Sequence, residues 1–248
     1  MKVVFHEDFK QVYTWDPAAT AGRMEAVIEA VKPHVEFVEA EPAFRQQIAA
    51  VHTELHIRQV ESQGLYQIAA LAAGGAIQAA EIGLIEPCFG LIRPPGHHAS
   101  AASAWGFCYL NNMAVALEAL WRQHKIESAC VLDIDLHYGD GTVNILGKRD
   151  WVTVSNIDGR SRSLYLREVE ASMKNCRADL IGISAGFDNH LDDWGGLLHT
   201  ADYEEIGGRV RTAADRSGGG CFAVLEGGYN HEVLGENVLA LIRGMSRG

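Results

Sequence analysis

The chain has 248 residues, of which 48% are hydrophobic and 21% are charged, and its formal net charge is −11. This length suits one large α/β domain as well as two small ones, and because the sequence shows no linker we expect residues 1–248 to form a single domain. The acidic charge argues against nucleic-acid binding, which requires basic surface. No apolar run reaches the roughly 20 residues of a membrane span, and no signal peptide precedes the first strand-like run. We therefore expect a soluble, cytoplasmic protein that binds no membrane.

The cysteines form no close pairs in the sequence. Cysteines with this distribution are typically buried free thiols in a reducing compartment. We therefore expect neither a disulfide framework nor a cysteine-bound zinc from Cys88, Cys108, Cys130, Cys176 and Cys221.

Strand-like and helical segments alternate along the chain without a hairpin signal. This alternation predicts a mostly parallel sheet with helices on both faces. Gly74-Gly75 inside one long helix requires a neighbour that packs closely there. Strands are predicted at 2–5, 35–38, 88–92, from 131, at 151–154, 179–184 and 221–225. Helices are predicted at 22–31, 43–51, 53–63, 65–84, 163–176, 203–215 and 233–245, with one more from a cap at Asn111 or Asn112 to 124.

The stretch 131–142 begins as a buried strand and ends as a polar loop, and it carries Asp133, Asp135 and His137. Because a strand has a period of two, these three side chains would start on one face. Two carboxylates and an imidazole inside a protein need a compensating cation. A solvated face on an edge strand is the alternative. The intervening apolar residues, including Leu136, argue for burial of the opposite face and therefore favour half of a metal site.

Three other polar clusters also follow predicted strands. His97-His98 follows strand 88–92 on a loop stiffened by two prolines, Asp188 follows 179–184, and Tyr229 follows 221–225. Each has an ordinary structural alternative: loop histidines, a helix cap or turn, and a core tyrosine. Open α/β sheets place their ligands at the carboxyl ends of strands, so convergence of four such segments predicts one site.

Together these segments resemble the zinc-dependent deacetylases, the family of histone deacetylases, acetylpolyamine amidohydrolases and acetoin-utilisation proteins. The resemblance implies a three-layer arginase/deacetylase-type α/β fold with a mostly parallel central sheet. It also implies hydrolysis of an N-acyl amide, expected to be N-acetyl, in a peptide lysine, a polyamine or a small molecule. The matching runs are 93–99 (RPPGHHA), 106–112 (GFCYLNN), 133–142 (DIDLHYGDGT), 185–188 (AGFD) and 225–230 (LEGGYN).

By this resemblance, one zinc ion would be bound by Asp135, His137 and Asp188. Three such ligands leave a catalytic zinc open positions for water and substrate. Adjacent histidines cannot point the same way in an extended loop, so each would need its own carboxylate. By the same resemblance, His98 would act as general base and then as acid, with Asp140 accepting from its ring. His97 would be an electrostatic group paired with Asp133. Tyr229 would donate a hydrogen bond to the carbonyl oxygen of the substrate.

Other roles implied by the resemblance concern the substrate and a structural cation. Phe107 would line the substrate tunnel, with an ordinary core aromatic as the alternative, and Gly106 and Gly227 are expected beside it among the substrate-binding residues. Gly227 and Gly228 would let the backbone approach the site. Arg23 is either a family arginine near the first helix or a surface residue, and Trp105 receives no role. A structural potassium ion would be bound near Asp133, Asp135, His137, Ser155 and Asn156.

The chain also departs from the family pattern. The segment 156–162 offers no aromatic for the opposite tunnel wall, although Tyr165 is a candidate, and no rim aspartate appears near Ser62. We therefore expect an open or truncated channel that suits a bulkier acyl group, a small-molecule amide or a rim completed by a neighbouring subunit in an oligomer.

Arginases, which share this fold, bind two manganese ions. His190 stands where they carry a further aspartate, so we expect one metal and interpret His190, Asp192 and Asp193 as loop residues. The alternatives are a binuclear-manganese ureohydrolase and a catalytically silent protein that binds acyl-lysine or a metal.

Overall fold

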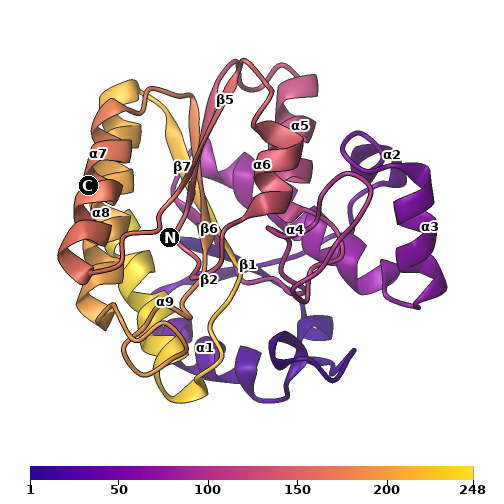
Figure 1. Ribbon diagram of the computed structural model, residues 1–248, viewed down its shortest axis with the longest axis horizontal. Helices are drawn as coiled ribbons and strands as arrows, with labels where there is room; N and C mark the ends of the chain where they lie inside the picture. The colour runs from indigo at the N-terminus through magenta and orange to yellow at the C-terminus, as the bar shows by residue number, and fades with distance from the viewer. Residues whose placement is uncertain (248) are drawn as a thin grey trace.

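The computed structural model describes residues 1–247, and within them the strands form one seven-stranded sheet in the order β2-β1-β3-β7-β6-β4-β5 (Figure 1). Every strand pair in this part of the chain is parallel, in agreement with the prediction. The strands are β1 (Lys2–Phe5), β2 (Glu36–Glu39), β3 (Cys88–Gly90), β4 (Ala129–Asp133), β5 (Val152–Asn156), β6 (Leu180–Ala185) and β7 (Gly220–Leu225).

Helices cover both faces of the sheet and give three layers, as predicted. In Figure 1, α7, α8 and α9 lie on one side of the strands and α4, α5 and α6 on the other, while α2 and α3 project beyond α4. The helices are α1 (Arg23–Val31), α2 (Arg45–Ile48), α3 (Glu54–Ser62), α4 (Tyr66–Gly83), α5 (Asn112–Arg122), α6 (Asp140–Leu146), α7 (Arg162–Asn175), α8 (Thr200–Ser217) and α9 (His231–Ser246).

Helix α4 shows why two glycines interrupt an alanine-rich helix. A Cβ at Gly74 would lie 1.9 Å from the carbonyl oxygen of Glu41 and 2.4 Å from the nitrogen of Ala43. The backbone at 41–43 therefore passes directly against the helix, where only glycine fits. The close packing that the sequence required is confirmed.

Of two helix starts near the site, one agrees with the sequence prediction and one does not. Asn111 caps α5, because its Oδ1 accepts the N–H of Ala114 at 2.8 Å. Helix α6 begins at Asp140, in a stretch that the sequence predicted to be a loop. The Gly-Asp-Gly run there is typical of a turn, but an aspartate in the first turn also stabilises a helix start.

The neighbouring strands β3, β7, β6 and β4 all end at the same edge of the sheet. The segments that follow them carry His97-His98, Tyr229, Asp188 and the pair Asp135 and His137. The sheet topology therefore brings the four predicted polar clusters together. The five cysteines are buried free thiols, as predicted. Among residues 1–247, no helix has both the length and the apolar character needed to cross a membrane.

Candidate active site

Asp135, His137 and Asp188 form a compact group of potential metal ligands. One ligand atom of each lies within 4.8 Å of the others. Nδ1 of His137 lies 3.2 Å from Oδ1 of Asp135 and 3.1 Å from Oδ2 of Asp188. The structure thus places the three predicted ligands around one point.

The reason that these side chains converge differs from the prediction. Strand β4 ends at Asp133, so Asp135 and His137 lie in the loop after it and strand alternation does not orient them. Instead, Asp133 Oδ1 accepts the N–H of Asp135 at 3.1 Å, and Asp135 Oδ1 accepts that of His137 at 2.9 Å. These local turns direct the side chains. Leu136, predicted to be buried, is exposed because the chain has already left the sheet.

The donor set fits a divalent cation. Asp188 is fully buried, and its Oδ2 makes no hydrogen bond of good geometry within the described residues, although His137 lies close to it. Burial and the Asp135 charge raise the pKa of Asp188 to about 7, and the two carboxylates raise the pKa of His137 to about 10. The pKa shift of Asp188 comes mainly from burial, and that of His137 comes from the two carboxylates. An ion bound by oxygen and nitrogen ligands would compensate the negative charge gathered here.

Gly227 leaves room for these carboxylates. Its N–H donates to Oδ2 of Asp135 at 2.8 Å. A Cβ at this position would lie 2.6 Å from that oxygen and 2.7 Å from Oδ2 of Asp188. Glycine therefore lets the loop after β7 pass directly against the group of ligands.

Each of the two adjacent histidines bonds to its own carboxylate. Nδ1 of His97 lies 3.1 Å from Oδ2 of Asp133, and Nδ1 of His98 lies 2.8 Å from Oδ1 of Asp140. The ring centroids are only 4.0 Å apart and the planes differ by 39°. Each histidine therefore has its own carboxylate, as expected, and the rings lie close together because residues 97 and 98 form a turn and not an extended segment.

The two buried histidines differ in protonation. Burial opposes the charge on His97, but the carboxylates of Asp135 and Asp133 outweigh it and raise its pKa. At His98, burial and the neighbouring His97 lower the pKa to about 4. Near neutral pH, His98 is consequently uncharged, and its Nε2 is free to accept a proton when Nδ1 donates to Asp140.

A cavity of about 120 Å³ joins these groups. Phe107 and Tyr229 face each other in it, with ring centroids 6.0 Å apart and planes at 82°. Burial raises the pKa of Tyr229, so its hydroxyl keeps its proton. Gly106 adopts φ +59°, and a Cβ there would lie 2.4 Å from Cδ2 of His98. The lining residues are Pro95, His97, His98, Trp105, Gly106, Phe107, His137, Trp194, Gly227 and Tyr229.

Trp194 is a cavity residue that sequence reasoning missed. Its ring stacks on Tyr229 at 4.0 Å and 26°, and it meets the His137 ring edge-on at 6.1 Å. A single tryptophan in a polar loop carries no periodic signal that could have revealed this. Tyr165, the predicted candidate for a tunnel wall, is instead buried in the core with its hydroxyl donating to the carbonyl of Ile134 at 2.8 Å.

Asp193 was predicted to be an ordinary loop residue, but it connects two loops of the site. Its Oδ2 accepts the backbone N–H groups of Tyr229 and Asn230, both at 2.8 Å. The carboxylate thereby ties the loop after β6 to the loop after β7. His190 stays a loop residue, with Nδ1 accepting the N–H of Asp192 at 3.1 Å and Nε2 lying 3.3 Å from the Thr200 hydroxyl.

Arg23 and Glu226 support the site from behind. Arg23 is fully buried and donates to the carbonyl oxygens of Gly228 at 2.8 Å and Glu226 at 2.6 Å, so the surface alternative was wrong. Oε2 of Glu226 accepts the N–H groups of Gly96 at 2.7 Å and His97 at 3.2 Å. These bonds fix the loop that carries both histidines.

The residues of the predicted potassium site lie on the neighbouring strands β4 and β5 and, for Asp135 and His137, in the loop after β4. Asp133 on β4 pairs with Asn156 on β5, and Ser155 pairs with Leu132. Oδ1 of Asn156 accepts the N–H of Gly139 at 2.7 Å. Bound potassium stays a prediction.

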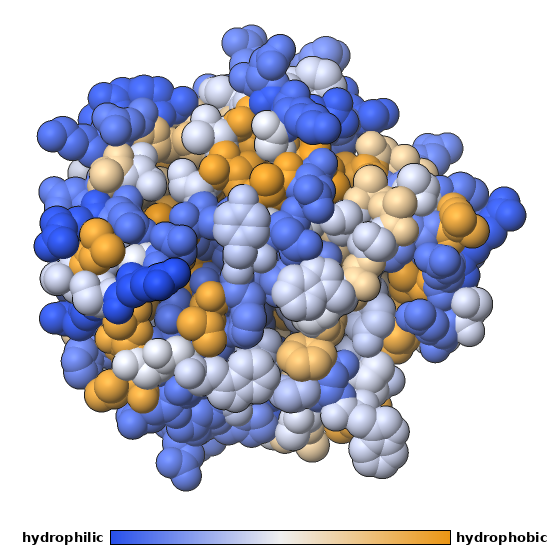
Figure 2. Space-filling model, in the orientation of Figure 1, coloured by the Kyte–Doolittle hydropathy of each residue, from blue (hydrophilic) through white to orange (hydrophobic). Residues whose placement is uncertain are grey.

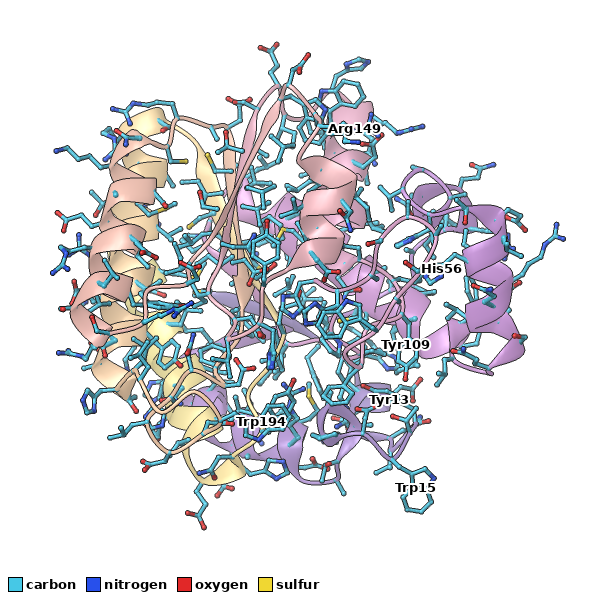
Figure 3. The ribbon with its side chains drawn as sticks, in the orientation of Figure 1. Tyr13, Trp15, His56, Tyr109, Arg149 and Trp194 are labelled. Carbon is cyan, nitrogen blue, oxygen red and sulfur yellow. The ribbon has the colours of Figure 1, made fainter. Side chains whose placement is uncertain are left out.

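A wider groove of about 700 Å³ borders the cavity across the Trp105-Gly106-Phe107 segment. Its far side is formed by α3, including Gln59, Ser62 and His56, whose Nε2 lies 2.7 Å from the carbonyl oxygen of Tyr109. In Figure 3, His56 and Tyr109 lie toward α3, and Trp194 lies toward α9. Figure 2 shows pale residues of intermediate hydropathy near the middle of this face, between mainly polar edges.

Comparison with known proteins gives the class of the protein. The family described as histone deacetylase domain matches residues 60–165 and 157–245. The chain belongs to the histone deacetylase family, and this membership supports an enzyme that hydrolyses acyl amides. Metal dependence is general in that family, and Asp135, His137 and Asp188 could bind an ion.

Particular relatives agree with this assignment. The chain is 30% identical to a probable deacetylase of Methanothermobacter thermautotrophicus over 91% of its own length and 84% of the relative. It is 32% identical to a histone deacetylase-like amidohydrolase of Pseudomonas aeruginosa, over 74% of the chain and 59% of that protein. The crystal structure of the HDA15 HD domain superposes with a TM-score of 0.81, covering 98% of this chain and 88% of that one at 23% identity, which supports the fold.

Proposed function

We propose that the protein is a zinc-dependent hydrolase of N-acyl amides, with N-acetyl amides as the first substrates to test. The observation that carries the proposal is the cavity that is lined together by His137 of the ligand group, an uncharged His98 and a protonated Tyr229. Deacetylase relatives supply the reaction class.

Asp135, His137 and Asp188 would hold the zinc ion. When bound there, zinc supplies a Lewis acid that polarises the amide carbonyl and makes water more acidic. The two ring nitrogens of His190 are engaged by the N–H of Asp192 and the hydroxyl of Thr200, which supports one ion rather than the two of a ureohydrolase.

His98 is the group assigned to move protons. Asp140 accepts from Nδ1 and so leaves Nε2 as the basic nitrogen that faces the cavity. His98 would take a proton from the attacking water and later give one to the leaving amine. His97, kept charged by Asp133 and Asp135, would contribute positive potential instead.

Tyr229 is assigned to the carbonyl oxygen. Its hydroxyl would donate a hydrogen bond that strengthens as negative charge develops on that oxygen. The Tyr229 ring stacks against Trp194, and the backbone N–H groups of Tyr229 and Asn230 donate to Asp193. These contacts hold the tyrosine in place.

The test is a panel of acetyl-lysine peptides, acetylpolyamines and longer acyl amides, assayed with the zinc-loaded protein. We expect release of free amine from at least one of these classes and loss of release in His98→Ala. Binding of a panel member without turnover by the zinc-loaded protein would contradict the proposal and favour a silent acyl-lysine-binding protein.

A further inference from the structure

Trp105 lies directly against the proposed general base. Its ring centroid is 3.8 Å from that of His98, with the planes at 30°. The His97 ring lies 4.0 Å from that of His98 with the planes at 39°, so the His98 ring is in close contact with two other rings. These contacts restrict rotation of the His98 imidazole.

Trp105 also bonds to the carboxylate that His98 uses. The indole N–H donates to Asp140 at 3.1 Å from Oδ1 and 3.0 Å from Oδ2. Oδ1 of the same carboxylate lies 2.8 Å from Nδ1 of His98. The Asp140 carboxylate therefore accepts hydrogen bonds from both Trp105 and His98, and the rings of these two residues also pack against each other.

Asp140 needs such a second partner. Its side chain is 36% exposed, so water competes for its oxygens. Asp133, the corresponding partner of His97, is fully enclosed and receives the N–H of Asp135. Trp105 is itself oriented by the turn that follows it, in which the N–H of Cys108 donates to its carbonyl oxygen at 3.1 Å.

We propose that Trp105 is a positioning residue for the His98–Asp140 pair. The indole N–H fixes the carboxylate, and the indole ring fixes the imidazole plane so that Nε2 faces the cavity. This inference rests on the proposed role of His98 and adds a residue that acts through it.

Two substitutions separate the contributions of Trp105. Trp105→Phe keeps an aromatic ring and removes the N–H, and Trp105→Ala removes both. The assay uses an amide that the wild-type protein hydrolyses. We expect kcat to fall about 3- to 10-fold in Trp105→Phe and about 10- to 100-fold in Trp105→Ala, with KM changed by less than about threefold in both. Trp121→Phe is the matched control, because that ring stacks on Trp151 away from the site, and its kcat should stay unchanged.

A double-mutant cycle tests whether the effect passes through Asp140. In an Asp140→Ala background, Trp105→Phe should cause no further loss of kcat, because the acceptor of the indole N–H is already gone. Fully additive losses, or a rise in KM with kcat unchanged, would overturn the positioning role while leaving amide hydrolysis intact.

A second readout needs no turnover. In ¹⁵N-labelled protein, the Nδ1–H proton of His98 should be protected from exchange with water and give a visible signal. We expect that signal to broaden or vanish in Trp105→Ala and to persist in Trp121→Phe. An unchanged signal in Trp105→Ala would contradict the inference, whereas inactivity of the wild-type protein on every amide would count against the proposed function alone.

Discussion

At the scale of single residues, the Tyr229 hydroxyl is the group whose contribution is simplest to isolate. Tyr229 lines the cavity, and burial keeps its hydroxyl protonated. Tyr229 is not one of the proposed metal ligands, so its loss should leave the metal in place. Tyr229→Phe should lower kcat about 100- to 1,000-fold, the usual effect of removing one donor to a developing oxyanion. Zinc content, measured by elemental analysis, should be unchanged, and wild-type turnover in the variant would remove Tyr229 from the mechanism.

Gly227 tests the packing around the ligands. A side chain there would collide with oxygens of both Asp135 and Asp188. Gly227→Ala should therefore weaken zinc binding about 10- to 100-fold, which a competition titration with a chromogenic chelator would measure. Gly208→Ala in α8 is the matched control, because the nearest atom to its Cβ would lie 3.9 Å away. Equal zinc affinity in the two variants would show that the close approach at Gly227 has no effect on the metal.

At the scale of secondary-structure elements, the sequence predicts where the site lies better than it predicts what surrounds it. Apolar runs followed by polar residues identify four strand ends, and parallel topology makes them meet. Periodicity says nothing of side chains beyond the last strand residue, which is why Leu136 was placed wrongly. Contacts of Trp105 and Trp194 depend on loops that pack only in the folded chain, so no local pattern reveals them.

His52 joins three segments and predicts a pH dependence of stability. Its Nδ1 donates to the carbonyl of Ser100 at 3.0 Å, and its Nε2 accepts the N–H of Asn111, the cap of α5, at 2.9 Å. The bond that Nε2 accepts requires the neutral ring, and burial, together with the nearby His56, lowers its pKa to about 4. The unfolded chain, with a pKa near 6.5, binds the proton more readily, so stability is lost as the pH falls from about 6.5 toward 4.

His52→Asn removes this titration. The stability advantage of the wild type over the variant should shrink by about 2 kcal/mol between pH 7 and pH 5, measured by urea unfolding at each pH. A constant difference between the two proteins across that range would show that His52 is not held neutral in the folded state.

At the scale of the whole molecule, metal binding and folding should be coupled. The ligands come from loops after β4 and β6, which meet only when the sheet has formed. Free zinc at 100 times its Kd should stabilise the fold by about 2.7 kcal/mol and raise Tm by roughly 5 to 10 °C for a chain of this size. Calorimetry with and without zinc would measure this shift, and zinc that leaves Tm unchanged would contradict a preformed site.

The count of metal ions per chain tests the central claim most directly. After equilibration with both zinc and manganese and removal of free metal, elemental analysis should find one zinc ion per wild-type chain. The Asp188→Asn variant, shown to be folded by circular dichroism, should retain almost none. Two ions per wild-type chain, or a full zinc complement in the variant, would contradict a single ion bound by Asp135, His137 and Asp188.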